Sequence, residues 1–340
     1  MKERIREAIQ HVCQELSWPT VVFTVEHPAE ISHGDYATNV ALVLAKQLNR
    51  APREVAADLS AALTGKLTEV EKIESAGPGF LNFYLTRDFF TTTTVHINEQ
   101  VEAWGKSTIA AGEEILFEYT SPNLFKPLHI GNLVGNIIGE SLTRLFENAG
   151  ATVRRINYPS DIGLTVAKGV WGLRQTGGNP DDIAALGEAY RVGNDAYEND
   201  PEAKADIEAV NRALYAGDDA ALLHLRAQGL QTSKARLSEL CRLLGTTFDS
   251  EIYESEVSDA GKAIVGENMG TVFTESAGAV VYEGEKHGLH TRVFVNSQGL
   301  PTYEAKDLGN FAKKAELYPS WTQAFIVTGS EQREYFKVLI

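Results

Sequence analysis

The side chains best suited to chemistry lie in one short segment, residues 121–132, whose sequence is SPNLFKPLHIGN. An apolar run precedes it and a glycine-spaced amphipathic stretch follows, which predicts a loop leading into the N-terminus of a helix. Helix N-termini attract anions. Lys126 and His129 can both donate to phosphate oxygens as negative charge builds up in a transition state. The segment therefore favours phosphate chemistry, although His129 alone would more often be a structural histidine.

Acidic and amide side chains flank this loop. Glu118 precedes it and Asn123 lies within it. Further along the chain, Tyr303 and Asp307 are four residues apart, and hence on one face of a helix. A phosphate-binding loop beside carboxylates suggests a small cationic molecule that is activated by ATP. Taken alone, Asp307 would more often be an exposed carboxylate at the start of a helix.

The elements expected around the loop form a parallel βαβ unit. The pattern predicts strands over 115–119 and 153–158 and a helix over 131–148, and a helical crossover makes the two strands parallel. Ligands of open parallel sheets bind beyond the carboxyl ends of the strands, where residues 118–132 and 157–161 arrive. The helix has one apolar face, made of Leu133, Ile137, Ile138, Leu142, Leu145 and Phe146.

Gly131, Gly135 and Gly139 recur every four residues along this helix. Close packing of the helix on a strand would explain the spacing. A close approach of the first turn to a nucleotide would also explain it. Both explanations can hold, because only the start of the helix lies at the predicted site.

The remaining segments indicate two domains joined by a connector. Residues 1–86 form a small α+β domain, with helices over 1–16, 37–48 and 52–63 and strands over 20–25 and 80–85. A helical connector, 87–112, leads to an α/β domain over 113–340. That domain contains a helical insertion at about 171–245, strands over 280–282, 291–296 and 324–328, a helix over 304–317 and a last helix after Ser330.

Composition limits the function classes. A net charge of −15 argues against broad non-specific binding to nucleic acid, yet it allows an RNA partner held by local basic or stacking side chains. No apolar stretch approaches the roughly 20 residues that span a bilayer, and the N-terminus lacks a secretory signal. Cys13 and Cys241 have no CxxC spacing, which argues against a disulfide framework or a cysteine zinc site. We expect a cytoplasmic protein with no membrane partner.

Seven stretches resemble one family, and they follow its order along the chain. The segment 121–132 resembles the HIGH signature of class I aminoacyl-tRNA synthetases, in the version found in arginyl-tRNA synthetases. HGDYATNVALVLAK and AGPGFLNFYL resemble the N-terminal domain of that family, and RINYPSDIG the segment after its first βαβ helix. FDSEIYESE resembles the exit of its inserted helical region. RVFVNSQGLPTYEAKDLG, followed by VTGSEQREYFKVL, resembles the second half of its nucleotide-binding fold.

The resemblance implies a Rossmann-type parallel-sheet catalytic domain that activates L-arginine with ATP, accompanied by Mg²⁺, and transfers it to tRNA(Arg). It implies no metal site on the protein, and we expect a monomer. The catalytic residues that it implies are Lys126, His129 and Asn132. The residues that it implies for ATP are Pro122, Asn123, His129, Gly131 and Asn132. Those that it implies for arginine are Glu118, Asn123, Asp161, Tyr303, Asp307 and Gln332.

Two assignments have plain alternatives. Phe80 and Asn82, which the resemblance places at tRNA, face one side of a strand and suit an unpaired base, but a core phenylalanine with a turn-facing asparagine fits as well. Asp161 can equally be a turn aspartate between Ser160 and Ile162.

The chain also departs from the family. Asn132 stands where the HIGH signature has its last histidine, and it cannot carry a charge. No segment corresponds to the KMSKS-type loop or to the anticodon-binding domain, so we expect the front part of a synthetase, with weak or no full charging of tRNA. Another HIGH-type nucleotidyl transferase, or a non-catalytic RNA- or partner-binding fragment, remains an alternative.

Overall fold

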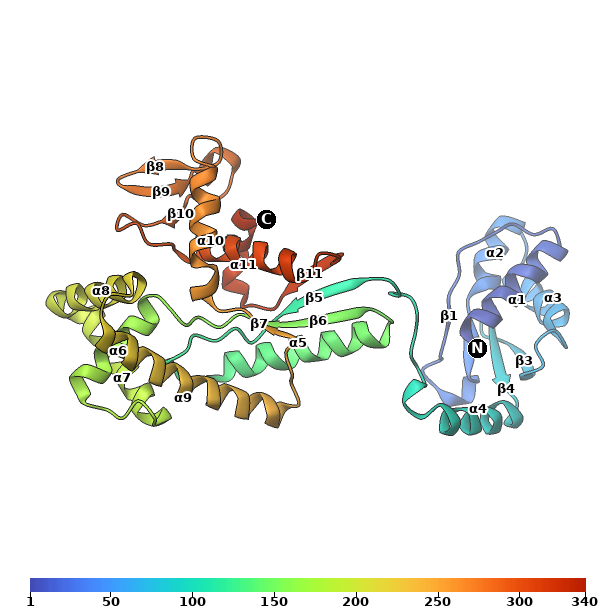
Figure 1. Cartoon of the computed structure of the whole chain (residues 1–340). Helices are drawn as coiled ribbons and strands as arrows, with labels where there is room; N and C mark the ends of the chain where they lie inside the picture. Colours follow the sequence, from blue (N-terminus) through green and yellow to red (C-terminus); the bar gives the residue numbers. More distant parts are fainter. The chain divides into compact units, whose positions relative to one another are not determined.

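The computed structural model describes all of residues 1–340 as two compact units, Met1–Trp104 and Gly105–Ile340 (Figure 1). None of its helices combines the length and the apolar character that crossing a membrane requires. The helix predicted as a connector, α4 (Arg87–Gln100), lies within the first unit together with the short turn Val101–Ala103.

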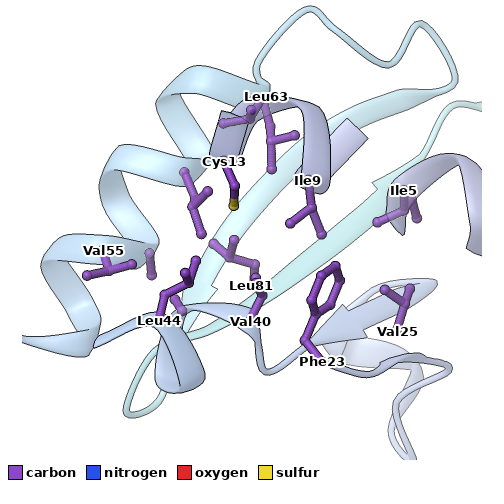
Figure 2. Packing of buried hydrophobic residues seen from close by; sticks show 14 of the residues in the cluster. Ile5, Ile9, Cys13, Phe23, Val25, Val40, Leu44, Val55, Leu63 and Leu81 are labelled. Atoms are coloured by element: carbon purple, nitrogen blue, oxygen red, sulfur yellow. The ribbon is translucent and has the colours of Figure 1, made fainter. Parts of the chain in front are cut away.

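The first unit has an antiparallel sheet and three helices that share one core. The sheet order is β1-β2-β4-β3, with bounds Val25–Glu26, Tyr36–Thr38, Phe80–Leu85 and Val70–Ala76. The helices are α1 (Lys2–Glu15), α2 (Val40–Leu48) and α3 (Pro52–Leu63). Figure 2 shows their apolar side chains meeting Leu81 of the sheet, and the core includes Ile5, Ile9, Val40, Leu44, Val55 and Leu63.

Two details of this unit differ from the sequence pattern. The β-branched run 20–25 forms a strand only from Val25, while residues 36–38 pair with β4 and delay the start of α2 to Val40. Strand β3 was not predicted. Its sequence, VEKIESA, is rich in charge because the strand lies at the sheet edge and is paired only to β4.

The second unit is built on a parallel sheet of order β11-β5-β6-β7. Its strands are β5 (Glu114–Glu118), β6 (Thr152–Asn157), β7 (Ser250–Glu251) and β11 (Gln323–Ile326), and every neighbouring pair is parallel. Helix α5 (Ile130–Asn148) connects β5 to β6. The predicted Rossmann-type α/β fold with a parallel sheet and a preceding α+β domain is confirmed.

Four helices between β6 and β7 form a separate group (Figure 1). They are α6 (Leu164–Thr176), α7 (Ile183–Asn199), α8 (Pro201–Ala216) and α9 (Ala220–Leu244). Their common core contains Val166, Val170, Leu186, Ile207 and Leu230, and it also takes in Leu124 and Phe125 from the loop after β5. This helical group begins at Leu164, before the insertion expected from about residue 171.

A second helical pair follows β7. Helices α10 (Glu254–Glu267) and α11 (Tyr303–Leu317) pack closely enough that a Cβ on Gly261 would lie 1.9 Å from the carbonyl oxygen of Ala305. An antiparallel sheet of order β10-β9-β8 joins them, with bounds Arg292–Val295, Ala279–Tyr282 and Thr274–Ser276. The last helix, α12 (Arg333–Leu339), follows a short turn at Ser330–Gln332.

Helix α5 presents its small and polar face to the sheet. Its buried residues are Asn136, Gly139, Glu140 and Thr143, whereas Ile130 is 72% exposed and Leu145 is 64% exposed. The ring of Tyr119 fills the space beside Gly139, and its hydroxyl donates to Glu140 at 2.7 Å. Most of the apolar face found in the sequence therefore points away from the sheet, whereas Phe146 packs against Phe117 of β5. At Gly139 the glycine spacing reflects close packing.

This packing predicts opposite effects for two glycines of α5. Alanine in place of Gly139 would set its Cβ 2.2 Å from the Tyr119 ring. Forced overpacking costs about 1–3 kcal/mol, more than the roughly 1 kcal/mol that a helix gains from alanine over glycine. Urea denaturation should show a lower free energy of unfolding for Gly139→Ala. Gly135→Ala is the control, because nothing lies within 4 Å of its Cβ, and it should be stabilising. Equal shifts for both variants would contradict this packing.

Candidate active site

The loop over residues 121–132, here called the phosphate loop, extends the parallel sheet beyond its strands. Backbone bonds join it to the segment after β6: the Leu124 N–H donates to the Ser160 carbonyl, and the Ser160 N–H donates to the Pro122 carbonyl, both at 3.0 Å. The Ser121 N–H donates to Asn157 Oδ1 at 3.1 Å. The two segments therefore lie side by side beyond the carboxyl ends of β5 and β6, as the topology predicts.

His129 caps helix α5. The Gly131 N–H donates to His129 Nδ1 at 3.1 Å, and the His129 N–H donates to Asn132 Oδ1 at 3.1 Å. Because Nδ1 accepts, the neutral ring carries its proton on Nε2, on an exposed side chain. Asn132 uses its oxygen for the cap, which leaves its amide N–H groups as donors. Lys126 is half-buried and forms no ion pair. The loop thus offers an imidazole N–H, an amide and an ammonium.

Four carboxylates gather on the elements that follow the strands. Glu118 ends β5, Asp161 follows β6, Glu254 begins α10 and Asp307 lies on α11. The first three are buried, and Asp307 is partly accessible. Buried carboxylates need compensation by a cation or by several hydrogen bonds, so the partners of each one decide what the site can bind.

Three of these carboxylates, Glu118, Glu254 and Asp161, already pair with a cation of the chain itself. The first two pair with lysines. Glu118 Oε2 pairs with Lys314 at 2.5 Å and accepts from Asn310 Nδ2 at 2.9 Å. Glu254 pairs with Lys306, and both side chains are almost fully buried. Burial raises the pKa of Glu254, and the Lys306 ammonium opposes that rise. In both cases the lysine comes from α11.

Asp161 is engaged on both oxygens. Arg226 of α9 donates to Oδ2 at 2.9 Å, and Ser255 donates through its backbone N–H to Oδ1 at 2.9 Å and through its hydroxyl to Oδ2 at 2.6 Å. The side chain is 4% exposed. These contacts tie α9 and the start of α10 to the segment after β6. Both oxygens of Asp161 are therefore engaged within the chain, and the arginine contact that the resemblance implies for it stays a prediction.

Asp307 differs from the other three because it forms no ion pair, and the Lys314 ammonium, which pairs with Glu118, acts on it only from a greater distance. Its contact is with Tyr335, whose hydroxyl donates to Oδ2 at 2.6 Å. Burial raises the pKa of Asp307 to about 7, the hydrogen bond from Tyr335 opposes the rise, and the charge of Glu118 adds to it. When a cation binds beside such a carboxyl group, its pKa falls and the group ionises.

The other predicted residues lie in three places. Tyr303, which is 52% exposed, lies one turn before Asp307 on α11, with its ring centre 4.6 Å from the Lys306 nitrogen. Gln332 is half-buried and forms the N-cap of α12, the helix that carries Tyr335. Pro122 is buried and Asn123 is half-buried in the phosphate loop.

Phe80 and Asn82 belong to the first unit. Phe80 is 37% exposed at the start of β4, whereas Asn82 is 5% exposed. Their neighbours Leu81 and Phe83 point into the core from the opposite face of the strand. An aromatic surface is therefore available at Phe80, while the Asn82 amide is enclosed.

Several site residues escaped the sequence analysis. Lys306, Asn310 and Lys314 repeat every four residues on α11, a buried polar stripe that the spacing could have indicated. Glu254 carries no such signal. Tyr158 was also missed: it is 8% exposed and its hydroxyl has no hydrogen-bond partner. Burial raises the pKa of that hydroxyl, and the charges of Glu254 and Asp307 raise it further, which places it in the field of this carboxylate group.

No group of three or more histidine, cysteine, aspartate or glutamate side chains in residues 1–340 is arranged to hold a metal ion. The carboxylates of the second unit are instead distributed among lysine, arginine, serine and tyrosine partners.

Comparisons with known proteins identify the family of the chain. Residues 1–85 match the family model of the arginyl tRNA synthetase N-terminal domain, and residues 96–340 match that of the class I (R) tRNA synthetase catalytic domain. An arginine–tRNA ligase of Geobacter sp. (strain M21) is 33% identical over 293 residues, covering 84% of this chain and 52% of that protein. One of Clostridium perfringens is 29% identical, covering 98% and 58%. The chain thus spans about half the length of the curated relatives it matches.

Two solved structures have a similar fold. The arginyl-tRNA synthetase of Thermus thermophilus has a TM-score of 0.59 and 26% identity, with 92% of this chain and 52% of that chain covered. That of Plasmodium falciparum has a TM-score of 0.67 at 19% identity, with 99% and 61% covered, and at this identity it supports the fold alone. The resemblance seen in the sequence is confirmed: the chain belongs to the class I arginyl-tRNA synthetase family.

Proposed function

We propose that this chain contributes the activation step of an arginine–tRNA ligase, in which L-arginine and ATP form arginyl-adenylate before transfer to tRNA(Arg). The observation that carries the proposal is the charge balance around Asp307. Three neighbouring carboxylates are compensated within the chain, and one partly accessible carboxylate has no cation. One carboxylate without an ion pair matches the one positive charge on the substrate's side chain.

The shape of the cation follows from the residues beside Asp307. A guanidinium is planar, permanently charged and able to donate two parallel hydrogen bonds to a carboxylate. The exposed ring of Tyr303 lies on the same face of α11 and offers a flat surface and a hydroxyl. A lysine ammonium has neither the plane nor the paired donors. A pocket that hydrogen-bonds the substrate in this way can reject analogues strongly.

The amino-acid end of the substrate belongs near Glu118 and Asn123. Both contacts of Glu118 within the chain fall on Oε2, which leaves Oε1 for the α-ammonium. Asn123 lies half-buried in the phosphate loop, where its amide can orient the α-carboxylate. Gln332, at the N-cap of α12, would instead contact the guanidinium together with Tyr303 and Asp307.

The phosphate loop serves the nucleotide. The α-carboxylate of arginine attacks the α-phosphorus of ATP, the bond to the bridging oxygen breaks, and pyrophosphate leaves. His129 Nε2–H, the Lys126 ammonium, the Asn132 amide and the N-terminus of α5 at Gly131 would stabilise the charge that develops on the phosphate oxygens. Mg²⁺ would accompany the triphosphate as its counter-ion. Pro122 shapes the loop, and Asp161 holds the neighbouring segment in place.

For the RNA partner we propose Phe80 as a stacking surface in the first unit, because its ring is accessible and stacking tolerates any base. Asn82 would contribute to base recognition only if β4 opened locally to expose its amide.

The function is tested by calorimetric titration with a non-hydrolysable arginyl-adenylate analogue. We expect the chain to bind it and to reject the lysyl analogue. Asp307→Asn should weaken binding by roughly 100-fold, since removing one partner of a buried charge pair costs about 2–5 kcal/mol. Asp259→Asn, at an exposed position on α10, is the control and should change nothing. Equal binding of both analogues would point to a different nucleotidyl transferase, and binding of neither to a non-catalytic module.

The raised pKa of Asp307 predicts that arginine binding releases a proton. In the free protein Asp307 keeps its proton up to about pH 7, whereas the guanidinium favours the ionised form. Release should approach one proton at pH 6 and vanish by pH 9, and affinity should rise over this interval. Calorimetry in buffers of different ionisation enthalpy measures the release. A proton count near zero at pH 6 would show that the cation binds elsewhere.

The same pKa fixes the pH dependence of stability. Between about pH 4 and pH 7 the folded chain holds a proton on Asp307 that the unfolded chain has lost. This group therefore makes the free energy of unfolding fall as pH rises through that interval, and its contribution is constant above it. The difference in unfolding free energy between Asp307→Asn and the unchanged chain should shift in favour of the variant from pH 4 to pH 8. A difference that does not vary with pH would contradict the assignment.

A further inference from the structure

Phe125 takes an unusual conformation in the middle of the phosphate loop. Its side chain is 2% exposed, and its φ of 68° lies in the left-handed region. Bulky side chains rarely adopt that region because the Cβ crowds the backbone. The surrounding structure must therefore hold Phe125 in place.

The ring of Phe125 packs against helices α6 and α9. A Cβ on Gly169 of α6 would lie 2.6 Å from Phe125 Cδ1, and a Cβ on Gly229 of α9 would lie 2.4 Å from Phe125 Cζ. Both glycines lie inside helices and have no positive φ, so their backbones do not require glycine. A glycine inside a helix lowers its stability relative to alanine. The phenyl ring therefore explains both positions.

Two further contacts fasten the same stretch of loop. The Phe125 N–H donates to the hydroxyl of Ser233, one turn after Gly229 on α9, at 3.2 Å. Pro127 Cγ lies 3.0 Å from the position of a Cβ on Gly187 of α7. Three helices of the group thus each place a glycine against residues 125–127, on both sides of Lys126.

The His129 imidazole and the Lys126 ammonium are therefore held by different parts of the unit. His129 is fixed to α5 through the hydrogen bonds of its cap. Lys126 lies between two residues that dock on α6, α7 and α9. The relative position of the ammonium and the imidazole depends on how this helical group sits against the sheet.

We propose that Phe125 is a positioning residue, through which helices α6, α7 and α9 set the place of Lys126 at the nucleotide. The proposal rests on the proposed role of Lys126 and His129 in phosphate binding. It assigns to the helical group a part in ATP binding, although the arginine side of the site is built from α10 and α11.

The test substitutes a helix residue that packs against the Phe125 ring, Gly229, rather than a residue of the loop. Gly229→Ala should displace the Phe125 ring, speed hydrogen exchange of the amides in residues 121–132, and weaken binding of the arginyl-adenylate analogue about tenfold. Its affinity for free L-arginine should fall much less than that for the analogue, because the proposed contacts at Asp307 and Glu118 lie outside the loop and only that at Asn123 lies within it. Gly266→Ala in α10, with no atom within 4 Å of its Cβ, is the matched control and should leave all three measurements unchanged.

Two more variants keep the test decisive if Gly229→Ala folds poorly. Ser233→Ala removes only the hydrogen bond to Phe125, and it should weaken binding of the analogue about fivefold and that of arginine much less. Phe125→Leu combined with Gly229→Ala makes room for the new methyl group and should recover most of the lost affinity. Equal weakening of analogue and arginine, no effect on either, or no recovery in the double variant would overturn the inference.

The outcome is separable from that of the proposed function. If the unchanged chain binds neither arginine nor the analogue, the proposed function is wrong. Hydrogen exchange then still tests the docking: faster loop exchange in Gly229→Ala and Ser233→Ala, but not in Gly266→Ala, supports it, and unchanged rates overturn it.

Discussion

Compensation of buried negative charge is the constraint on which the second unit depends. Four carboxylates lie on the segments that follow its parallel strands and on the helices beside them, and each must meet a positive or donating group. Close packing of α10 and α11 at Gly261 brings Lys306 to Glu254, and the same face of α11 brings Asn310 and Lys314 to Glu118. Asp307 lies on the same helix without an ion pair, and in the proposed function the substrate supplies its cation.

In the proposed function the site has two halves with separate supports. The amino-acid half depends on α10, α11 and the start of α12. The nucleotide half depends on the cap of α5 and on the helical group that seats Phe125. Left-handed backbone at Thr120, Ser121 and Phe125 concentrates in the segment that joins them. Such conformations persist only where their surroundings fix them, and they cluster at functional sites.

Local patterns in the sequence were enough to predict the parallel βαβ unit, the loop that leads into α5 and the shared face of Tyr303 and Asp307, because each depends on residues a few positions apart. Local patterns could not predict pairings between residues that are distant in the sequence. Glu118 and Lys314 are far apart in the chain, so no spacing rule links them. The orientation of α5 was hidden for a related reason: its burial depends on how the Tyr119 ring fits Gly139, and the apolar periodicity pointed to the opposite face.

The central claim is that the negative charge of Asp307 selects a guanidinium. The side chain of citrulline has nearly the shape of the arginine side chain but carries no charge. The ratio of the dissociation constants of arginine and citrulline therefore isolates this interaction. Calorimetry at pH 8 should show arginine bound roughly 100-fold more tightly than citrulline by the unchanged chain, and nearly equal binding by Asp307→Asn. If Asp307→Asn keeps the full preference for arginine, the cation is recognised by another group and the account is wrong.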